Sequence, residues 1–474
     1  MRRFASLIRT LPNNPASFFL LVAIPATLLF IVLTPPFQAP DEPTHLYKIV
    51  QLSEGHVLAS RIDDKHVGEQ LPAAYLQTAN RYYNLRVITT QKASVHQIFH
   101  DLRHPDRDKT PVFTPFENTA VYPPLSYVPQ VVGVAIARAA SAPVVLQLYI
   151  ARLMSAAAFI VIVYAAIKRL PFGKWAAVAL SCTPLSLFLA ASCAGDAITA
   201  AIALFVIAAI ARLARGTESL RPKDLAPLLA ATLALGLCKS PYFLVAFLFF
   251  AIPMRRFSRP RNYWLGLVLI VGLPLLLALV WTAIVHGIVI NIAQGSDNSL
   301  QLHQMVHHPL RTVETLARGL LFSSVNNSLP QQSIDLSVGM AAPFPQWLYI
   351  TSYIFVTGAI LFDPASAKLK DVARRMRLIA LGIIAAGFAA ITTLLYITFT
   401  AVGVHDVSGL QGRYFTPFWY LLIPAGGGLL VLQDKHRYKQ FTACLCGFIV
   451  VGVAFGLLAI VARYYLPGYL LLSS

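Results

Sequence analysis

A few charged residues stand at the edges of long apolar runs, where a charge is costly and usually serves a function. Asp41 and Glu42 directly follow the first apolar run, and His45 comes one helical turn later. Their position at the membrane exit, with a histidine one turn later, favours a functional site. Asp41 and Glu42 are therefore the candidate catalytic residues, with His45 beside them as a candidate binding residue.

Four further charges occupy comparable positions in distant parts of the chain. Arg152 lies about two turns inside a later apolar run, whereas Asp196, Lys239 and Arg413 each lie at the end of one. Together with Asp41 and Glu42, these residues bring acids and bases to the outer face of the predicted membrane body. These residues are therefore candidates for binding a substrate or its phosphate.

The acidic residues among these candidates also have structural explanations. Asp41 and Glu42 stand beside prolines, so they could be solvated loop acids. Asp196 could cap the helix that is expected to begin at Ala197. Composition and spacing leave both explanations open.

The basic residues have structural explanations as well. Lys239 and Arg413 could be interfacial anchors whose long stems reach toward lipid headgroups. Arg152 could be a buried structural charge paired with backbone carbonyls. A functional role for any of the three requires an acid and a cation to meet in one place.

The amino-acid composition indicates the class of protein in which these charges lie. Of 474 residues, 57% are hydrophobic and 12% are charged, whereas soluble domains carry about 25% charged residues. The net charge of +18 comes from short Lys and Arg clusters between apolar runs, a pattern that encodes membrane topology. The sequence therefore predicts an all-α polytopic membrane protein whose partner is the lipid bilayer, with no nucleic acid.

The apolar runs predict about 11 transmembrane helices, most of them close to the 20 residues that a crossing needs. The runs are 18–35, 144–167, 175–191, 197–213, 225–238, 241–253, 263–285, 347–362, 378–402, 415–432 and 441–462. Residues 225–238 and 241–253 are short, and basic residues flank both ends of the pair, which favours a tight hairpin.

The basic clusters fall in alternate loops, which predicts a cytoplasmic N-terminus and a periplasmic C-terminus. Residues 123–140 are apolar, but counting them as a crossing would invert every later loop, so an interfacial or re-entrant helix is expected there. The predicted regions are 1–17 (cytoplasmic), 18–35 (first crossing), 36–142 (large periplasmic loop with juxtamembrane helices), 143–285 (crossings 2–7), 286–346 (second periplasmic loop) and 347–474 (crossings 8–11).

No metal or cofactor site is predicted. His96, His100 and His104 recur every fourth residue, but a solvated helical surface explains this spacing. The five cysteines lie in or beside apolar runs without metal-ligand spacing, and Gly173-Lys174 lacks the rest of a phosphate-binding loop.

An ordered set of short motifs resembles the bacterial membrane-protein family known as domain of unknown function 2142. The motifs are Ala39-Pro40-Asp41-Glu42-Pro43-Thr44-His45, Gln51-Leu52-Ser53-Glu54-Gly55, Tyr122-Pro123-Pro124-Leu125-Ser126-Tyr127, Ala151-Arg152-Leu153, Ser192 to Asp196, Lys239-Ser240-Pro241-Tyr242 and Gln411-Gly412-Arg413-Tyr414. They cover most of the chain, and their order is more specific than any single motif.

That family in turn resembles the C-type (GT-C) membrane glycosyltransferases, which keep an acid in the first outer loop and a Pro-Pro-Leu segment on a surface helix. The resemblance implies a GT-C-like fold in a bacterial inner membrane. It also implies an inverting transfer of a sugar from a polyprenyl-phosphate carrier to a glycan, lipid or protein acceptor. Asp41 would be the base, and Lys239 and Arg413 would hold the departing phosphate.

The remaining candidates would support that reaction. Glu42 and Asp196 would orient the acceptor or the base, Arg152 would assist either, and Tyr414 belongs to the Arg413 motif. Two other classes of function stay open: a transporter or flippase for a glycan or lipid-linked precursor, and a noncatalytic scaffold. Substrate uptake without a covalent product would favour the first, and indifference to substitution of these charges would favour the second.

Overall fold

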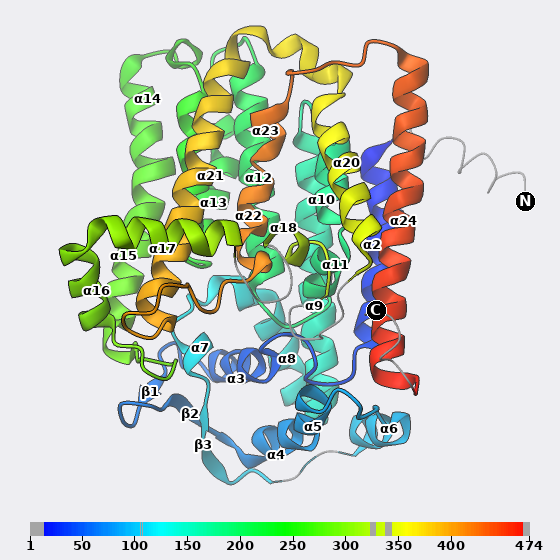
Figure 1. Ribbon diagram of the computed structural model, residues 1–474, viewed down its shortest axis with the longest axis vertical. Coiled ribbons are helices and arrows are strands. Elements are labelled where there is room, and N and C mark those ends of the chain that lie inside the picture. The colour runs from blue at the N-terminus through cyan, green and yellow to red at the C-terminus, as the bar shows by residue number, and fades with distance from the viewer. Residues whose placement is uncertain (1–13, 105, 107, 323–328, 337–343, 468–474) are drawn as a thin grey trace, which may run out of the picture.

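The computed structural model describes residues 14–104, 106, 108–322, 329–336 and 344–467. Long helices form a bundle, and a smaller layer of short helices and strands covers one end of it (Figure 1). Residues 1–13 and 468–474, for which opposite sides of the membrane are predicted, lie outside the described residues.

Seven helical segments of the described chain are long and apolar enough to cross a membrane. They are α2 (Pro15–Leu33), α9 (Val144–Arg169), α12 (Asp196–Arg215), the joined helices α14 (Pro260–Leu267), η5 (Val268–Gly272) and α15 (Leu273–Val285), then α20 (Gln346–Leu361), α21 (Lys370–Phe399) and α24 (Lys435–Tyr465). The prediction of a helical, polytopic membrane protein is confirmed.

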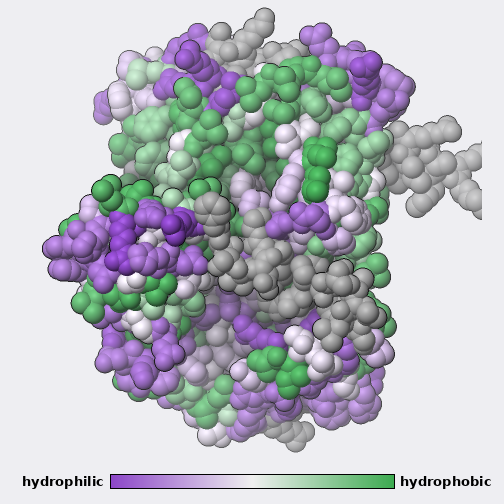
Figure 2. Space-filling view, viewed as in Figure 1, coloured by the Kyte–Doolittle hydropathy of each residue, from purple (hydrophilic) through white to green (hydrophobic). Residues whose placement is uncertain are grey.

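The outward faces of these helices are apolar. Val32 on α2, Val161 on α9 and Leu458 on α24 are each more than 60% exposed, which suits hydrocarbon better than water. In Figure 2, hydrophobic side chains cover much of the upper bundle, and hydrophilic ones gather over the lower end.

Four of the eleven predicted crossings are shorter or broken. Residues 175–191 form α10 (Lys174–Ser181) and α11 (Pro184–Ala190), residues 225–238 form α13 (Pro222–Gly236), residues 241–253 form the 3-10 helix η3 (Tyr242–Ala251), and residues 415–432 form α22 (Thr416–Trp419) and α23 (Leu422–Gly426). Prolines explain the breaks, because a proline cannot donate the hydrogen bond that a helix interior needs. At about 2 Å per residue, ten residues of 3-10 helix extend roughly 20 Å, farther than the same length of α-helix.

The layer at the lower end of the bundle comes mainly from the first polar loop (Figure 1). It contains α3 (Glu42–Ser53), α4 (Ala73–Arg81), α5 (Tyr83–Val87), α6 (Val95–Arg103), α7 (Glu117–Ala120), η2 (Leu125–Tyr127) and α8 (Val128–Ala139). A three-stranded antiparallel sheet, which the all-α prediction lacked, joins β1 (Ser60–Arg61), β2 (Val67–Pro72) and β3 (Pro111–Pro115), with β2 in the centre. Helix α8 belongs to the region for which an interfacial or re-entrant helix is expected.

The second polar loop forms α16 (Asn298–His307), α17 (Pro309–Phe322) and α18 (Leu329–Gln332). Helix α17 lies across the long helices rather than along them (Figure 1). This loop therefore returns to the bundle and packs against its side.

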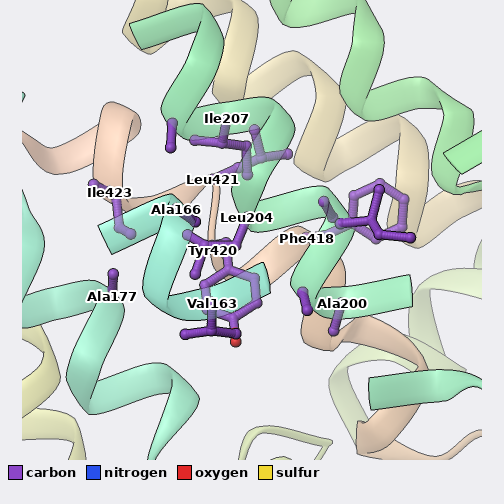
Figure 3. Packing of buried hydrophobic residues seen from close by; sticks show 14 of the residues in the cluster. Val163, Ala166, Ala177, Ala200, Leu204, Ile207, Phe418, Tyr420, Leu421 and Ile423 are labelled. Carbon is purple, nitrogen blue, oxygen red and sulfur yellow. The ribbon is translucent and has the colours of Figure 1, made fainter. Parts of the chain in front are cut away.

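Small residues let the central helices approach closely. Ala166 on α9, Ala177 on α10 and Ala200 on α12 are all buried, and Figure 3 shows them among larger side chains such as Phe418 and Tyr420. Alanines at such contacts bring the helix backbones near enough for tight packing, which drives association within a membrane. This packing fixes the lower helix ends, where the candidate residues lie.

Candidate functional site

The backbone between α2 and α3 places Asp41 at the end of the bundle. Helix α2 ends at Leu33, and Asp41 directly precedes α3 with a left-handed φ of 55°. Non-glycine residues seldom adopt this conformation, and such strain gathers at functional sites.

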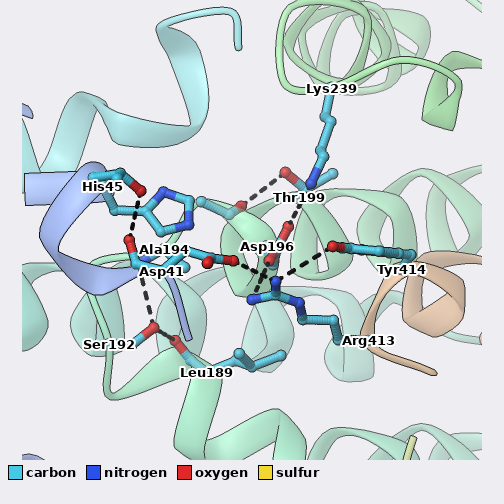
Figure 4. Close-up of polar contacts among 12 residues, drawn as sticks. Asp41, His45, Leu189, Ser192, Ala194, Asp196, Thr199, Lys239, Arg413 and Tyr414 are labelled. Atoms are coloured by element: carbon cyan, nitrogen blue, oxygen red, sulfur yellow. Dashed lines mark hydrogen bonds and ion pairs between the residues drawn. The ribbon is translucent and has the colours of Figure 1, made fainter. Parts of the chain in front are cut away.

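Arg413 contacts this carboxylate from the opposite end of the chain. Its Nη2 atom donates to Asp41 Oδ2 at 2.6 Å, although the residues are 372 positions apart. Arg413 belongs to the 3-10 helix η8 (Gly412–Phe415) and is only 4% exposed. Figure 4 shows its guanidinium group between Asp41, Asp196 and Tyr414.

A second arginine approaches the other oxygen of Asp41. The Nη2 atom of Arg86, on α5, lies 3.5 Å from Asp41 Oδ1. Arg463, on α24, holds this segment by donating to the carbonyl oxygens of Leu85 and Thr89 at 2.7 and 2.9 Å. Burial raises the pKa of Asp41, but nearby positive charges and the hydrogen bond from Arg413 together lower it by more, so that pKa lies below its usual range and the carboxylate is ionised at neutral pH.

A second acid and cation complete the cluster. Asp196, the first residue of α12, lies 3.2 Å from Lys239 Nζ and 3.8 Å from Arg413 Nη1. Lys239 follows α13, and its ammonium group lies 4.3 Å from the ring centre of Tyr122 and 5.0 Å from that of Tyr414. Electron-rich ring faces attract a cation, so the two tyrosines fix where Lys239 points.

His45 lies behind the charged groups. It is 3% exposed, and its Nδ1 atom is 2.8 Å from the hydroxyl oxygen of Tyr127. Burial lowers its pKa to about 4, although the charges of Asp196 and Asp41 oppose this change. His45 is therefore neutral at pH 7 and can exchange a hydrogen bond with Tyr127.

Glu42 and Arg152 form a separate pair. Both side chains are fully buried, and Arg152 donates from Nε to Glu42 Oε1 at 2.8 Å and from Nη2 to Oε2 at 2.6 Å. The remaining donors of Arg152 reach the carbonyl oxygens of Ile31, Thr34 and Pro35 at 2.7 to 3.2 Å. The pair therefore clamps the segment before Asp41 onto α9, with both carboxylate oxygens of Glu42 occupied.

The cluster carries an excess of positive charge and free donors. Three cations (Arg86, Lys239 and Arg413) face two carboxylates (Asp41 and Asp196). Among the described residues, neither Nε nor Nη1 of the buried Arg413 has a hydrogen-bond partner. A buried donor without a partner is costly, so this arrangement fits an anion such as a phosphate.

An apolar cavity begins one helical turn beyond Arg413. It has a volume of about 240 Å³ and is lined by residues of α10, α11, α20, α22, α23 and α24. Thr416 and Trp419, which follow Arg413 closely in the chain, line the cavity, and Phe448 and Ile449 line it from α24. The cavity offers a hydrocarbon chain a place within the bundle.

The structure brings together five of the eight residues singled out in the sequence, with a sixth behind them. Asp41, Asp196, Lys239, Arg413 and Tyr414 form one cluster, and His45 packs behind it. Asp196 pairs with cations, and no cap hydrogen bond from a side chain is present at the start of α12. Glu42 and Arg152 meet each other instead, as the structural explanation for Arg152 allowed.

Three contributors were missed. Tyr122 and Tyr127 lie in a motif that carries the family resemblance, but neither was selected as a site residue. Nothing in the sequence distinguishes Arg86 from the other basic residues of the loop. Within the described part of the chain, no group of three metal-ligating side chains is found.

Comparison with known proteins gives one match. The model of a family described as predicted membrane protein (DUF2142) matches residues 25–422, a range that contains every residue of the cluster. No curated protein and no solved structure matches the chain. Because the matched range covers far more than half of its length, the chain belongs to the DUF2142 family of membrane proteins.

Proposed function

We propose that this protein is a GT-C-like glycosyltransferase that moves a sugar from a polyprenyl-phosphate carrier to an acceptor outside a bacterial inner membrane. The observation that carries the proposal is the cluster itself: an ionised carboxylate, Asp41, lies in one cluster with the buried cation Arg413 and the partly buried cation Lys239. A base beside phosphate-binding cations is what such a transfer needs.

The reaction would proceed by inversion at the anomeric carbon. The acceptor oxygen forms a bond to that carbon while the bond from carbon to phosphate oxygen breaks. The acceptor proton goes to Asp41, and the electron pair leaves with the polyprenyl phosphate, next to Arg413 and Lys239. The donor phosphate would compete with Asp41 for Arg413, whose free Nε and Nη1 atoms supply hydrogen bonds.

The apolar cavity supports a lipid carrier rather than a soluble donor. Thr416, which lines the cavity, follows Arg413 by three residues, so a carrier whose phosphate is held at Arg413 would have its chain near the cavity. The total of eleven membrane crossings that the sequence predicts is part of the same proposal, as is their GT-C arrangement. So is the placement of the cluster on the periplasmic side.

The decisive experiment measures transfer by the purified protein from radiolabelled undecaprenyl-phosphate hexoses to cell-envelope acceptors. Replacing Asp41 with Asn should lower the rate by at least ~100-fold, the range that general-base catalysis supplies. The matched control is Asp64→Asn, because Asp64 lies in the same loop region with a side chain 95% exposed.

Three outcomes contradict parts of the proposal. Full activity of the Asp41→Asn variant removes Asp41 as the base. Carrier movement across proteoliposomes without a covalent product favours a flippase. Glycan profiles that stay unchanged when Asp41, Lys239 and Arg413 are replaced together favour a scaffold.

A further inference from the structure

A second cavity lies at the opposite end of the bundle from the charged cluster. Its volume is about 410 Å³, and it forms where α2 and α24 begin and α9 meets α10. Six of the side chains that line it are Lys174, Lys435, Lys439, Phe172, Trp175 and Tyr438. Lys435, Tyr438 and Lys439 are spaced to share one face of α24.

The charges of this cavity favour an anion. Among the described residues, the side chains of Lys174, Lys435 and Lys439 form no hydrogen bond or ion pair, so their charges remain available. Asp363 is the one carboxylate among the lining residues, and it is 7% exposed. It accepts hydrogen bonds from Gly173 N at 2.5 Å and from the Tyr438 hydroxyl at 3.5 Å. Three lysines and one carboxylate therefore leave the cavity with a net positive charge.

The floor of the cavity is apolar and aromatic. Phe172 and Trp175 are 1% and 5% exposed, and the ring of Trp175 packs on Phe18 of α2 at 5.6 Å. Tryptophan and tyrosine gather where a membrane meets water because one side of each ring system is apolar and the other polar. A ligand here would meet lysines on one side and rings on the other.

We propose that this cavity binds the headgroup of an anionic phospholipid. The phosphate would lie among Lys174, Lys435 and Lys439, and the acyl chains would follow the lipid-facing sides of α2 and α24. A glycerophospholipid combines a phosphate for the lysines with hydrocarbon for the apolar floor. The proposal concerns a site remote from Asp41 and Arg413 and does not depend on the proposed transfer reaction.

Native mass spectrometry of the purified full chain tests this assignment with phosphatidylglycerol and phosphatidylcholine as probes. We expect phosphatidylglycerol to be retained preferentially, and the K174Q/K435Q/K439Q variant to bind it roughly tenfold or more weakly, since each lysine near a lipid surface contributes appreciably. The K435Q/K439Q variant, which changes only exposed residues of α24, should show a smaller loss in the same direction.

The matched control is R255Q/R259Q/R261Q, which removes three exposed charges from another basic loop. It should bind phosphatidylglycerol like the wild type. Equal weakening in both triple variants would mean general surface attraction and would overturn the proposal. Displacement of the lipid by millimolar inorganic phosphate alone would overturn it as well, because the site would then recognise a small anion without hydrocarbon. Thermal unfolding of each variant shows whether the fold is retained.

Discussion

Arg413 holds two carboxylates at once, with Nη2 at 2.6 Å from Asp41 and Nη1 at 3.8 Å from Asp196. A planar guanidinium group can present parallel donors to two oxygens, whereas an ammonium group is a point charge. Arg413 therefore sets the distance between the two acids as well as the charge of the pocket. In the proposed reaction, it also meets the phosphate.

Replacing Arg413 with Lys should keep the charge but lose this geometry. We expect the rate of sugar transfer to fall at least ~10-fold, because one ammonium group cannot keep both the hydrogen bond to Asp41, worth about 1.5–3 kcal/mol when charged, and the ion pair with Asp196. The measurement is the initial rate of product formation. Arg318→Lys, in an exposed pair on α17, is the control and should have no effect. Equal rates for both variants would contradict a bridging role.

His45 predicts a specific dependence of stability on pH. Its pKa is lowered to about 4 in the folded protein, whereas the unfolded chain titrates near 6.5. Between these values the unfolded state binds the additional proton, so the free energy of unfolding should decrease as pH falls from about 6.5 to 4, by about 3 kcal/mol. The lowered pKa of Asp41 acts only at still lower pH.

Thermal unfolding in detergent at a series of pH values measures this effect. The His45→Gln variant keeps a polar partner for Tyr127 but cannot titrate, so its profile should be flatter over that interval. The exposed residue His96 provides the control, and His96→Gln should follow the wild type. A steep profile that survives His45→Gln would assign the effect to another group.

The position of the start of α3 depends on a contact between α3 and α9. Arg152 links the Glu42 carboxylate to carbonyl oxygens at the end of α2, so one side chain joins three helices. Burying two charges is costly, but leaving one of them without its partner costs more. The clamp therefore positions Asp41 without contacting any substrate.

Replacing Arg152 with Met should destabilise the fold by about 3–5 kcal/mol, because Glu42 would be left charged, buried and unpaired. The double variant Glu42→Gln with Arg152→Met should recover part of that loss. Arg318→Ala, which breaks an exposed pair, should change the free energy of unfolding by less than about 1 kcal/mol. Chemical denaturation in detergent distinguishes these cases. An Arg152→Met variant as stable as wild type would refute the clamp.

At the scale of the whole molecule, the two ends of the bundle differ in kind. One end carries the sheet, the short helices and the charged cluster, and the other carries the basic segments around Lys174 and Lys435 (Figure 1). Positively charged loops remain on the cytoplasmic side during insertion. The cluster end should therefore face the periplasm.

Cysteine labelling in intact cells tests this orientation. In a background without the five native cysteines, Asp64→Cys should react with a membrane-impermeant maleimide from outside. Arg437→Cys should react only after the membrane is permeabilised. Both positions are exposed, so access alone decides the result. The reverse pattern would place the cluster on the cytoplasmic side and exclude the proposed donor geometry.

Some features of this protein follow from its sequence alone. Hydrophobicity and charge are local properties, so the long apolar runs predicted helices that cross a membrane, and costly charges such as Asp41 and Arg413 could be selected by position. The shorter runs were harder to predict, because prolines at 184 and 424 interrupt two of them. The order of the motifs likewise indicated the family.

The partners of those charges were decided only by the tertiary structure. Glu42 and Asp41 are neighbours in the chain, yet one pairs with Arg152, 110 residues away, and the other with Arg413, 372 residues away. Which partner each acid meets depends on the direction in which the left-handed turn at Asp41 points its side chain and on how α9, α12 and η8 pack. Arg86 joins the site for the same reason, because α24 holds its segment in place through Arg463.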